Sequence, residues 1–133
     1  MEHVIVKTVC GFLNGDGGTL LIGVEDDGNV YGLQADYDTL GSKGDRDGFE
    51  LWLRQHLSNN LSVETAGLVR VSFDSVGDSD VCTVTVPASG KPVFTKPVEG
   101  GGGKHTEFWV REGNRTIQLH GDEMFEYQQN HWG

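Results

Sequence analysis

The chain contains apolar segments with helical spacing and apolar segments with strand spacing. Residues 2–14 form a dense apolar run whose length, and the Asn-Gly pair at its end, favour a largely buried helix. In residues 49–57 the apolar side chains recur at intervals of three and four, the spacing of an amphipathic helix. Asp45 or Asp47 can cap the start of this second helix. A third helix is expected near the C-terminus, with Asp122 as its cap.

Strand patterns lie between these helices. Residues 19–24 are almost continuously apolar, which predicts a central strand buried on both faces, with a short partner strand at 30–33. Residues 68–73 and 81–86 alternate, which predicts an antiparallel hairpin. The other expected segments are a loop at 34–48, an edge strand at 93–95, a mobile glycine-rich loop at 99–104, a strand at 107–111 and a turn at 113–114.

The order of the elements predicts a single α+β domain over residues 1–133, with three helices and a mixed, mainly antiparallel sheet. Cys10 and Cys82 lie far apart and outside any metal-ligand spacing, which favours free, buried cysteines in a reducing compartment. No apolar run approaches the roughly 18 residues of a membrane span, and the N-terminus does not resemble a secretory signal. We therefore expect a cytoplasmic protein without a membrane partner.

The net charge narrows the function classes. Ten Lys and Arg residues against twenty Asp and Glu residues give a formal charge of −10. A domain that holds nucleic acid by general electrostatic attraction should be basic, so the composition argues against that class. Two interpretations of the acidity stay open: the surface of a salt-adapted, halophilic protein, and an ordinary acidic cytosolic domain.

Common phosphate-loop and metal motifs are not found in the sequence. The run Gly100–Lys104 lacks the spacing of a Walker A motif, no GxGxxG fingerprint occurs, and the five histidines are scattered. We therefore expect no cofactor and no metal. Glu25 and Asp26 follow a predicted strand, where carboxylates can bind a divalent cation or act in acid–base catalysis. The alternative is that the segment simply forms a turn at Asp27-Gly28. Glu25 and Asp26 are therefore weak catalytic candidates.

Basic residues are few, and they gather at two places. Lys43 and Arg46 share one predicted loop, and Arg111 and Arg115 flank the predicted turn at 113–114. Guanidinium groups beside the exposed amides of a turn suit contact with phosphate. The alternative is that both places are simply solvated loops.

Two aromatic residues precede the second of these turns. Phe108 and Trp109 lie in a predicted strand, where successive side chains face opposite sides, so one of the two should face solvent. An exposed aromatic ring beside the basic turn could stack on a nucleobase. The alternative is that the ring packs in the core.

Three separated blocks of the chain resemble the signature of the Schlafen AlbA-like DNA-binding domain family. Residues 12–28 read FLNGDGGTLLIGVEDDG, similar to the family pattern FxNxxGGxLxxGVxDxG. The similarity continues at 32–33 and 45–50, and returns in WVREGNRT at 109–116 and LHGDEMFEY at 119–127. It implies an α+β nucleic-acid-binding module of the kind found in transcriptional regulators and beside helicase-like or ATPase-like regions of longer proteins.

The resemblance also raises the question of catalysis. Eukaryotic Schlafen relatives cleave structured RNA with a three-carboxylate metal site, two acids of which come from an N-terminal ExxxxEFK segment, while the third maps onto the Glu25-Asp26 region. This sequence begins at Met1 inside the first predicted helix, so the first family strand and its acids are missing from it. Either residues precede Met1 in the native protein or this member is shorter. An open sheet edge would then be left for a second copy or a tail.

The sequence thus favours a noncatalytic domain that binds DNA or RNA as part of a transcriptional regulator. Two alternatives stay open: a metal-dependent endoribonuclease core that needs the missing segment, and a protein-interaction or dimerisation module. A homodimer and further domains of a longer protein are the expected protein partners. The residues expected to contact the nucleic-acid backbone are Arg111, Asn114, Arg115, Lys43 and Arg46.

Overall fold

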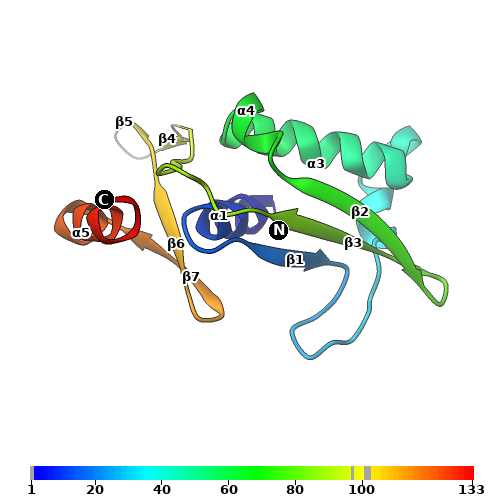
Figure 1. The fold of residues 1–133 in the computed structure, drawn as a ribbon. Helices are drawn as coiled ribbons and strands as arrows, with labels where there is room; N and C mark the ends of the chain where they lie inside the picture. The colour runs from blue at the N-terminus through cyan, green and yellow to red at the C-terminus, as the bar shows by residue number, and fades with distance from the viewer. Residues whose placement is uncertain (1, 97, 101–102) are drawn as a thin grey trace.

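Helices and strands follow one another along the chain largely as the apolar spacing predicts. The computed structural model describes residues 2–96, 98–100 and 103–133, so Gly101 and Gly102 of the expected glycine-rich loop lie outside the described residues. The fold class is α+β, and all three expected helices are present. The elements are α1 (Glu2–Leu13), β1 (Gly18–Ile22), α2 (Gln34–Asp38), the 3-10 helix η1 (Gly41–Lys43), α3 (Arg46–Asn60), α4 (Val63–Ala66), β2 (Arg70–Val76), β3 (Ser79–Val86), β4 (Val98–Gly100), β5 (Gly103–His105), β6 (Phe108–Glu112), β7 (Arg115–Leu119) and α5 (Gly121–Trp132), as drawn in Figure 1.

The described strands pair antiparallel and form three small sheets rather than one. The largest has the order β1-β3-β2, and β4–β5 and β6–β7 are separate two-stranded sheets. The predicted hairpin at 68–86 is confirmed as β2 and β3. Residues 87–96, between β3 and β4, contain two prolines and no strand. Because proline lacks the N–H that a sheet needs, this segment separates the sheets.

The strand β1 lies at an edge of its sheet. It pairs with β3 from Gly18↔Val86 to Ile22↔Cys82, and no strand of the described chain pairs with its other edge. Leu21 on β1 is 47% exposed. The prediction of a central strand buried on both faces was therefore wrong, because β3 takes the central position. Dimerisation through the outer edge of β1 stays a prediction.

Two expectations about the next segment were also wrong. The partner strand at 30–33 is reduced to a single antiparallel bridge between Val24 and Val30. Gly23, at φ 101°, turns the chain after β1. Its carbonyl oxygen accepts hydrogen bonds from the N–H groups of Tyr31 and Gly32, each at 2.9 Å. The stretch 34–48, expected as a loop, contains α2 and η1. Tyr37 gives α2 an apolar anchor, because it is buried against α3.

The N-terminal cap predicted for α3 is confirmed, whereas the one predicted for α5 is not. Asp45 caps α3, since its Oδ1 accepts the Gly48 N–H at 2.8 Å. The cap position of α5 is His120, and Asp122 lies inside the first turn. The expectation that Asp122 is the cap was therefore wrong. Its carboxylate still lies at the end of the helix where negative charge is favourable.

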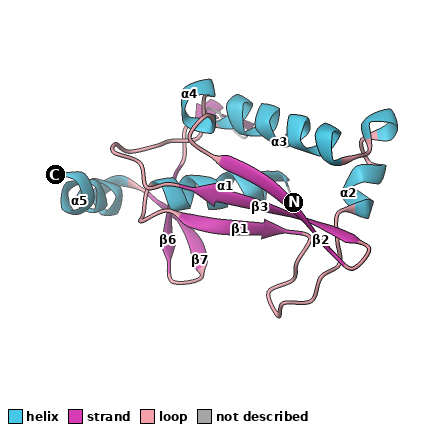
Figure 2. Ribbon diagram, turned by 45° about the vertical axis from the view of Figure 1, so that its right-hand side comes forward, coloured by secondary structure: helices cyan, strands magenta, loops and turns pink. Residues whose placement is uncertain are grey.

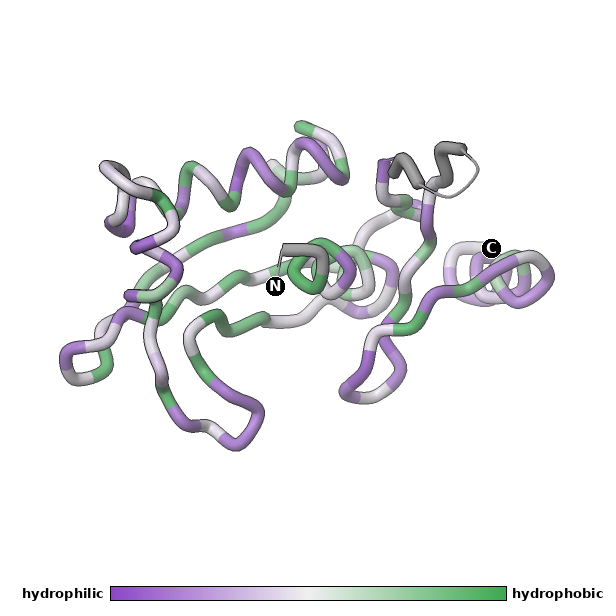
Figure 3. The backbone as a smooth tube through the Cα atoms, turned by 180° about the vertical axis from the view of Figure 1, so that it is seen from behind, coloured by the Kyte–Doolittle hydropathy of each residue, from purple (hydrophilic) through white to green (hydrophobic). Residues whose placement is uncertain are grey.

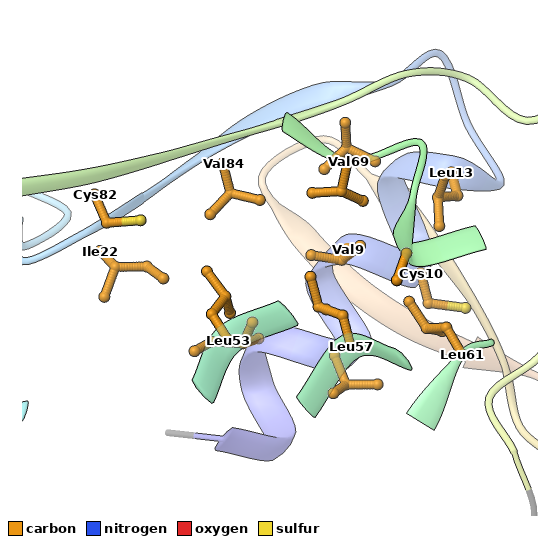
Figure 4. Close-up of a cluster of buried hydrophobic side chains, with 14 of the residues drawn as sticks. Val9, Cys10, Leu13, Ile22, Leu53, Leu57, Leu61, Val69, Cys82 and Val84 are labelled. Atoms are coloured by element: carbon orange, nitrogen blue, oxygen red, sulfur yellow. The ribbon is translucent and has the colours of Figure 1, made fainter. Parts of the chain in front are cut away.

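Among the described residues, one hydrophobic cluster draws most of its members from α1, α3 and the β1-β3-β2 sheet. Figure 2 shows the backbone of these elements. Figure 4 shows Val9 of α1, Leu53 of α3 and Val84 of β3 within this cluster. Cys10 and Cys82 lie in it as buried free thiols, as expected. Burial raises the pKa of Cys10 to about 11 and that of Cys82 to about 12, so both stay as unreactive thiols.

The β6–β7 hairpin lies between α1 and α5 (Figure 1). Trp109 is packed in the core with α1, while Phe108 meets the rings of Tyr127 and Trp132 on α5. Phe108 is 1% and Trp109 is 9% exposed. The expectation that one of the two faces solvent was wrong, because α5 covers the face of the strand that the core leaves free.

Asn14, directly after α1, joins three segments of the chain. Its buried Nδ2 donates to the carbonyl oxygens of Val93, at 2.9 Å, and Trp109, at 2.8 Å, and its Oδ1 accepts the Val93 N–H at 2.8 Å. Val93 is held by the Asn14 side chain, and the Thr95 N–H donates to the Glu107 carbonyl at 2.9 Å, but residues 93–95 form no strand, so the strand prediction there was wrong.

We expect Asn14→Ala to lower the free energy of unfolding by about 3 kcal/mol or more, because it removes three hydrogen bonds and leaves buried backbone groups unpaired. Urea denaturation followed by circular dichroism measures the change. Asn130→Ala, at an exposed position of α5, is the matched control and should change stability by less than about 0.5 kcal/mol. Equal effects of the two variants would show that Asn14 does not hold the three segments together.

Candidate nucleic-acid interface

A concave pocket of about 320 Å³ opens where the end of α1, the β6–β7 hairpin and α5 meet. These three parts lie side by side in Figure 1, although they are far apart in the sequence. We refer to this site as the α1–α5 pocket. It is lined by Phe12, Gly15, Asp16, Gly17, Arg111, Gly113, Tyr127 and His131.

Arg111 is the cation that the structure places in the pocket wall. Its Nη1 donates to Thr116 Oγ1 on β7 at 2.9 Å, and its guanidinium carbon lies 4.9 Å from the centroid of the Phe12 ring. This ring contact is a cation–π interaction. Its Nε is buried without a hydrogen-bond partner among the described residues. Packing therefore fixes the side chain while part of its donor capacity stays unused.

Glycines make room for this arrangement. A Cβ at Gly11 would lie 3.2 Å from Cγ of Arg111, so the helix surface is bare where the arginine stem crosses it. A Cβ at Gly18 would lie 2.4 Å from the Phe12 ring, and Gly17, at φ 82°, approaches the backbone of β3 too closely for any side chain. Gly18 thus makes room for the ring on which Arg111 rests, while Gly17 allows the close approach to β3.

The opposite wall comes from α5. Tyr127 and His131 lie one turn apart and their rings stack, with centroids 5.4 Å apart and planes 17° apart. The Tyr127 hydroxyl donates to the carbonyl oxygen of Asn14 at 2.5 Å, which ties α5 to the end of α1. Burial raises the pKa of Tyr127, and the negative charge of Asp16 adds to the effect, so the phenol keeps its proton. Neither ring was predicted as a site residue from the sequence. The indications present there were their i, i+4 spacing and, for Tyr127, its place in the family-like block 119–127.

Asn114 and Arg115 lie at the tip of the β6–β7 hairpin, next to the pocket. Both are exposed, and the tip is one of the hydrophilic parts of the chain in Figure 3. Arg115 forms an ion pair with Glu112 across the turn, and Gly113, at φ 62°, opens that turn. An exposed ion pair of this kind contributes little to stability. Arg115 can therefore exchange its carboxylate for a phosphate at low cost.

Arg46 and Lys43 lie elsewhere, near the start of α3. Arg46 Nη2 donates to Asp80 Oδ1 at 2.8 Å and to Ser75 Oγ at 2.6 Å, and the Tyr37 hydroxyl donates to Asp80 Oδ2 at 2.7 Å. These contacts connect α2, α3 and the β2–β3 hairpin. Lys43 belongs to η1, and its side chain lies outside the described part of the structure. A role of Arg46 and Lys43 in binding stays a prediction.

The weak catalytic candidates are in the loop after β1. Glu25 and Asp26 are exposed, and the expected turn is present, because the Gly28 N–H donates to the Glu25 carbonyl at 2.8 Å. The Asp27 carboxylate accepts from Asn29, which closes the turn. Within the described ranges, no three His, Cys, Asp or Glu side chains gather in a way that could hold a metal ion. Catalysis by Glu25 or Asp26 therefore stays untested.

Comparison with families of known sequence matches residues 1–120 to a model described as Schlafen, AlbA_2. The chain belongs to the Schlafen AlbA_2 family. AlbA_2 domains are grouped as nucleic-acid-binding domains. The matched residues include α1, the Gly17-Gly18 pair and the β6–β7 hairpin, whereas Tyr127 and His131 lie beyond them.

The fold is also similar to a solved structure. The crystal structure of the DIP2311 protein from Corynebacterium diphtheriae matches with a TM-score of 0.62 and 23% sequence identity. The match covers 99% of this chain and 22% of that protein, so the AlbA_2 chain spans about a fifth of the length of DIP2311. At this identity the likeness concerns the fold alone. No described helix combines the length and the apolar character needed to cross a bilayer.

The Arg46–Asp80 contact makes stability depend on pH. Arg46 and then Tyr37 hold the charged form of Asp80 and lower its pKa to about 2. A lowered pKa stabilises the folded state above the unfolded-state value near 4, and the contribution is lost as the pH falls toward about 2. We expect the stability difference between the wild type and Asp80→Asn to shrink over this range. Urea denaturation at each pH measures it, and a difference that does not change with pH would contradict the prediction.

Arg46→Gln provides the companion measurement. Arg46 is the main cause of the lowered pKa of Asp80. Asp80→Asn should therefore cost less stability at pH 7 when it is made in the Arg46→Gln variant than when it is made in the wild type. The four proteins form a double-mutant cycle. Additive effects at pH 7 would show that the two side chains are not coupled.

Proposed function

We propose that this AlbA_2 domain binds DNA or RNA through the α1–α5 pocket and the tip of the β6–β7 hairpin, without catalysis, as part of a transcriptional regulator. The observation that carries the proposal is the position of Arg111. A guanidinium that rests on the Phe12 ring and is held by Thr116 lines an open pocket next to an exposed turn. The pocket suits contact with a nucleobase, and the exposed turn beside it suits contact with phosphate.

This surface carries several of the few cations of the chain, together with the carboxylates of Asp16 and Glu112. In a chain with net charge −10, three cationic side chains come from α1 and the β6–β7 hairpin: Lys7, whose Nζ lies 4.7 Å from the centroid of the Trp109 ring, Arg111 and Arg115. His131 on α5 adds a titratable ring beside Arg111. Because the whole molecule repels polyanions, affinity has to come from short-range contacts at this surface rather than from long-range attraction.

Binding of labelled strands tests the proposal. Fluorescence anisotropy is measured with single-stranded RNA, duplex RNA, single-stranded DNA and duplex DNA over a series of salt concentrations. We expect saturable binding of at least one polymer by the wild type, and a loss of about tenfold or more, about 1.4 kcal/mol, in Arg111→Ala. Arg115→Ala should lose about two- to threefold, because its exposed side chain contributes mainly charge.

Two controls separate the surface from the rest of the protein. Arg70→Ala removes an exposed arginine from β2, in the β1-β3-β2 sheet, and should leave the affinity unchanged. Arg111→Lys keeps the charge but not the planar donor group, and should restore less than half of the lost binding free energy. The proposal fails if the folded wild type binds none of the four polymers, or if Arg70→Ala loses as much affinity as Arg111→Ala.

The noncatalytic part of the proposal is tested in the same samples. Labelled structured RNA is incubated with the protein and with Mg²⁺ or Mn²⁺, and the products are separated on a denaturing gel. We expect the strands to stay intact. Cleavage that disappears in Glu25→Gln or Asp26→Asn would instead establish the endoribonuclease alternative and would identify the carboxylate involved.

A further inference from the structure

The α1–α5 pocket has the size and the walls of a small-ligand site. Its volume of about 320 Å³ lies at the lower end of the range for ligand pockets. Phe12, Tyr127 and His131 give it aromatic walls, and Tyr127 and His131 stack on each other with nearly parallel rings. A pocket of this size cannot admit a helical segment. It suits one planar group taken out of a strand.

The charges in the pocket favour a neutral ligand. Asp16 and Arg111 both line it, so a phosphate would meet the carboxylate and a cation would meet the guanidinium. His131 is the third titratable group of the lining, and the Tyr127 phenol is the fourth. A ligand with hydrogen-bond donors for Asp16 and acceptors for Arg111 would satisfy both charged groups at once.

Among the nucleobases, guanine offers this combination most fully. Its N1–H and N2–H₂ groups are adjacent donors that match the two oxygens of a carboxylate, and its O6 and N7 are adjacent acceptors that match a guanidinium. Adenine and cytosine each present fewer donors to a carboxylate. A base can use both edges only when it is unpaired and turned out of the strand.

We infer that the α1–α5 pocket takes one unpaired nucleobase of the bound strand, guanine in preference to the others, with Asp16 on its Watson–Crick edge and Arg111 on O6 and N7. The inference rests on the proposed function and makes it more specific. Asp16 then selects the base, whereas Arg111 contributes both to general affinity and to selection. Tyr127 and His131 supply the stacking surface.

The test uses short single strands that differ at one position. Oligouridine strands carry a central guanine, adenine, cytosine or abasic site, and a second set carries dG, dA, dC or an abasic site in oligo-dT. Anisotropy with the wild-type protein should show the guanine strand bound at least fivefold more tightly than the others. The two sets distinguish RNA from DNA as the source of the base.

Asp16→Asn is the decisive variant. Asp16 is exposed in a loop, so the protein should fold normally. We expect this variant to bind the guanine strand and the adenine strand within twofold of each other. Asp74→Asn, at an exposed position of β2, is the matched control and should keep the full guanine preference.

The outcomes separate this inference from the proposed function. Equal binding of all strands, including the abasic ones, would overturn the base pocket while leaving nucleic-acid binding intact. A preference for another base, or a guanine preference that survives in Asp16→Asn, would overturn the assignment of guanine to Asp16. Failure of the folded protein to bind any strand in either set would overturn both proposals.

Discussion

The hydrogen bonds of Asn14 are the constraint on which the arrangement of this domain depends. The segment after β3 contains prolines and cannot continue the sheet, so its buried backbone at Val93 needs a partner from elsewhere. The Asn14 side chain supplies that partner and also binds β6 through the Trp109 carbonyl. The main-chain carbonyl oxygen of Asn14 accepts a hydrogen bond from the Tyr127 hydroxyl of α5. One residue therefore sets the positions of the core helix, the hairpin and the last helix, which are the three parts that form the pocket.

The sequence predicted those features that depend on neighbouring residues. The helices α1 and α3, the Asp45 cap and the β2–β3 hairpin follow from local spacing and turn chemistry. The errors concern what covers each element. Leu21 is exposed because β1 is an edge strand, and Phe108 is buried because α5 covers the second face of β6. Which element buries each face of a strand is decided by packing between distant segments. The hydrophobic periodicity of one segment carries no information about that packing.

The candidate site likewise contains residues that local sequence predicts and residues that only tertiary contacts place there. Arg111, Asn114 and Arg115 could be chosen from the sequence because a turn flanked by arginines is a local pattern. Tyr127 could not, because its place opposite Arg111 depends on a hydrogen bond to a residue 113 positions earlier. The role of the glycines beneath the site could not be predicted from residue types alone. Gly11 and Gly18 are needed for space, at positions where only the folded chain brings a side chain close.

The acidity of the chain takes on a different meaning once the pocket is considered. A basic surface increases affinity for every polyanion and discriminates little between sequences, because phosphates are the same at each step. A carboxylate inside the site opposes the backbone and can be compensated only by a base that donates to it. In the proposed base pocket, Asp16 and Arg111 in one lining would lower general affinity and favour one chemical partner. If the domain binds nucleic acid as proposed, its affinity has to come from short-range contacts, since attraction by charge alone is too weak to hold the strand.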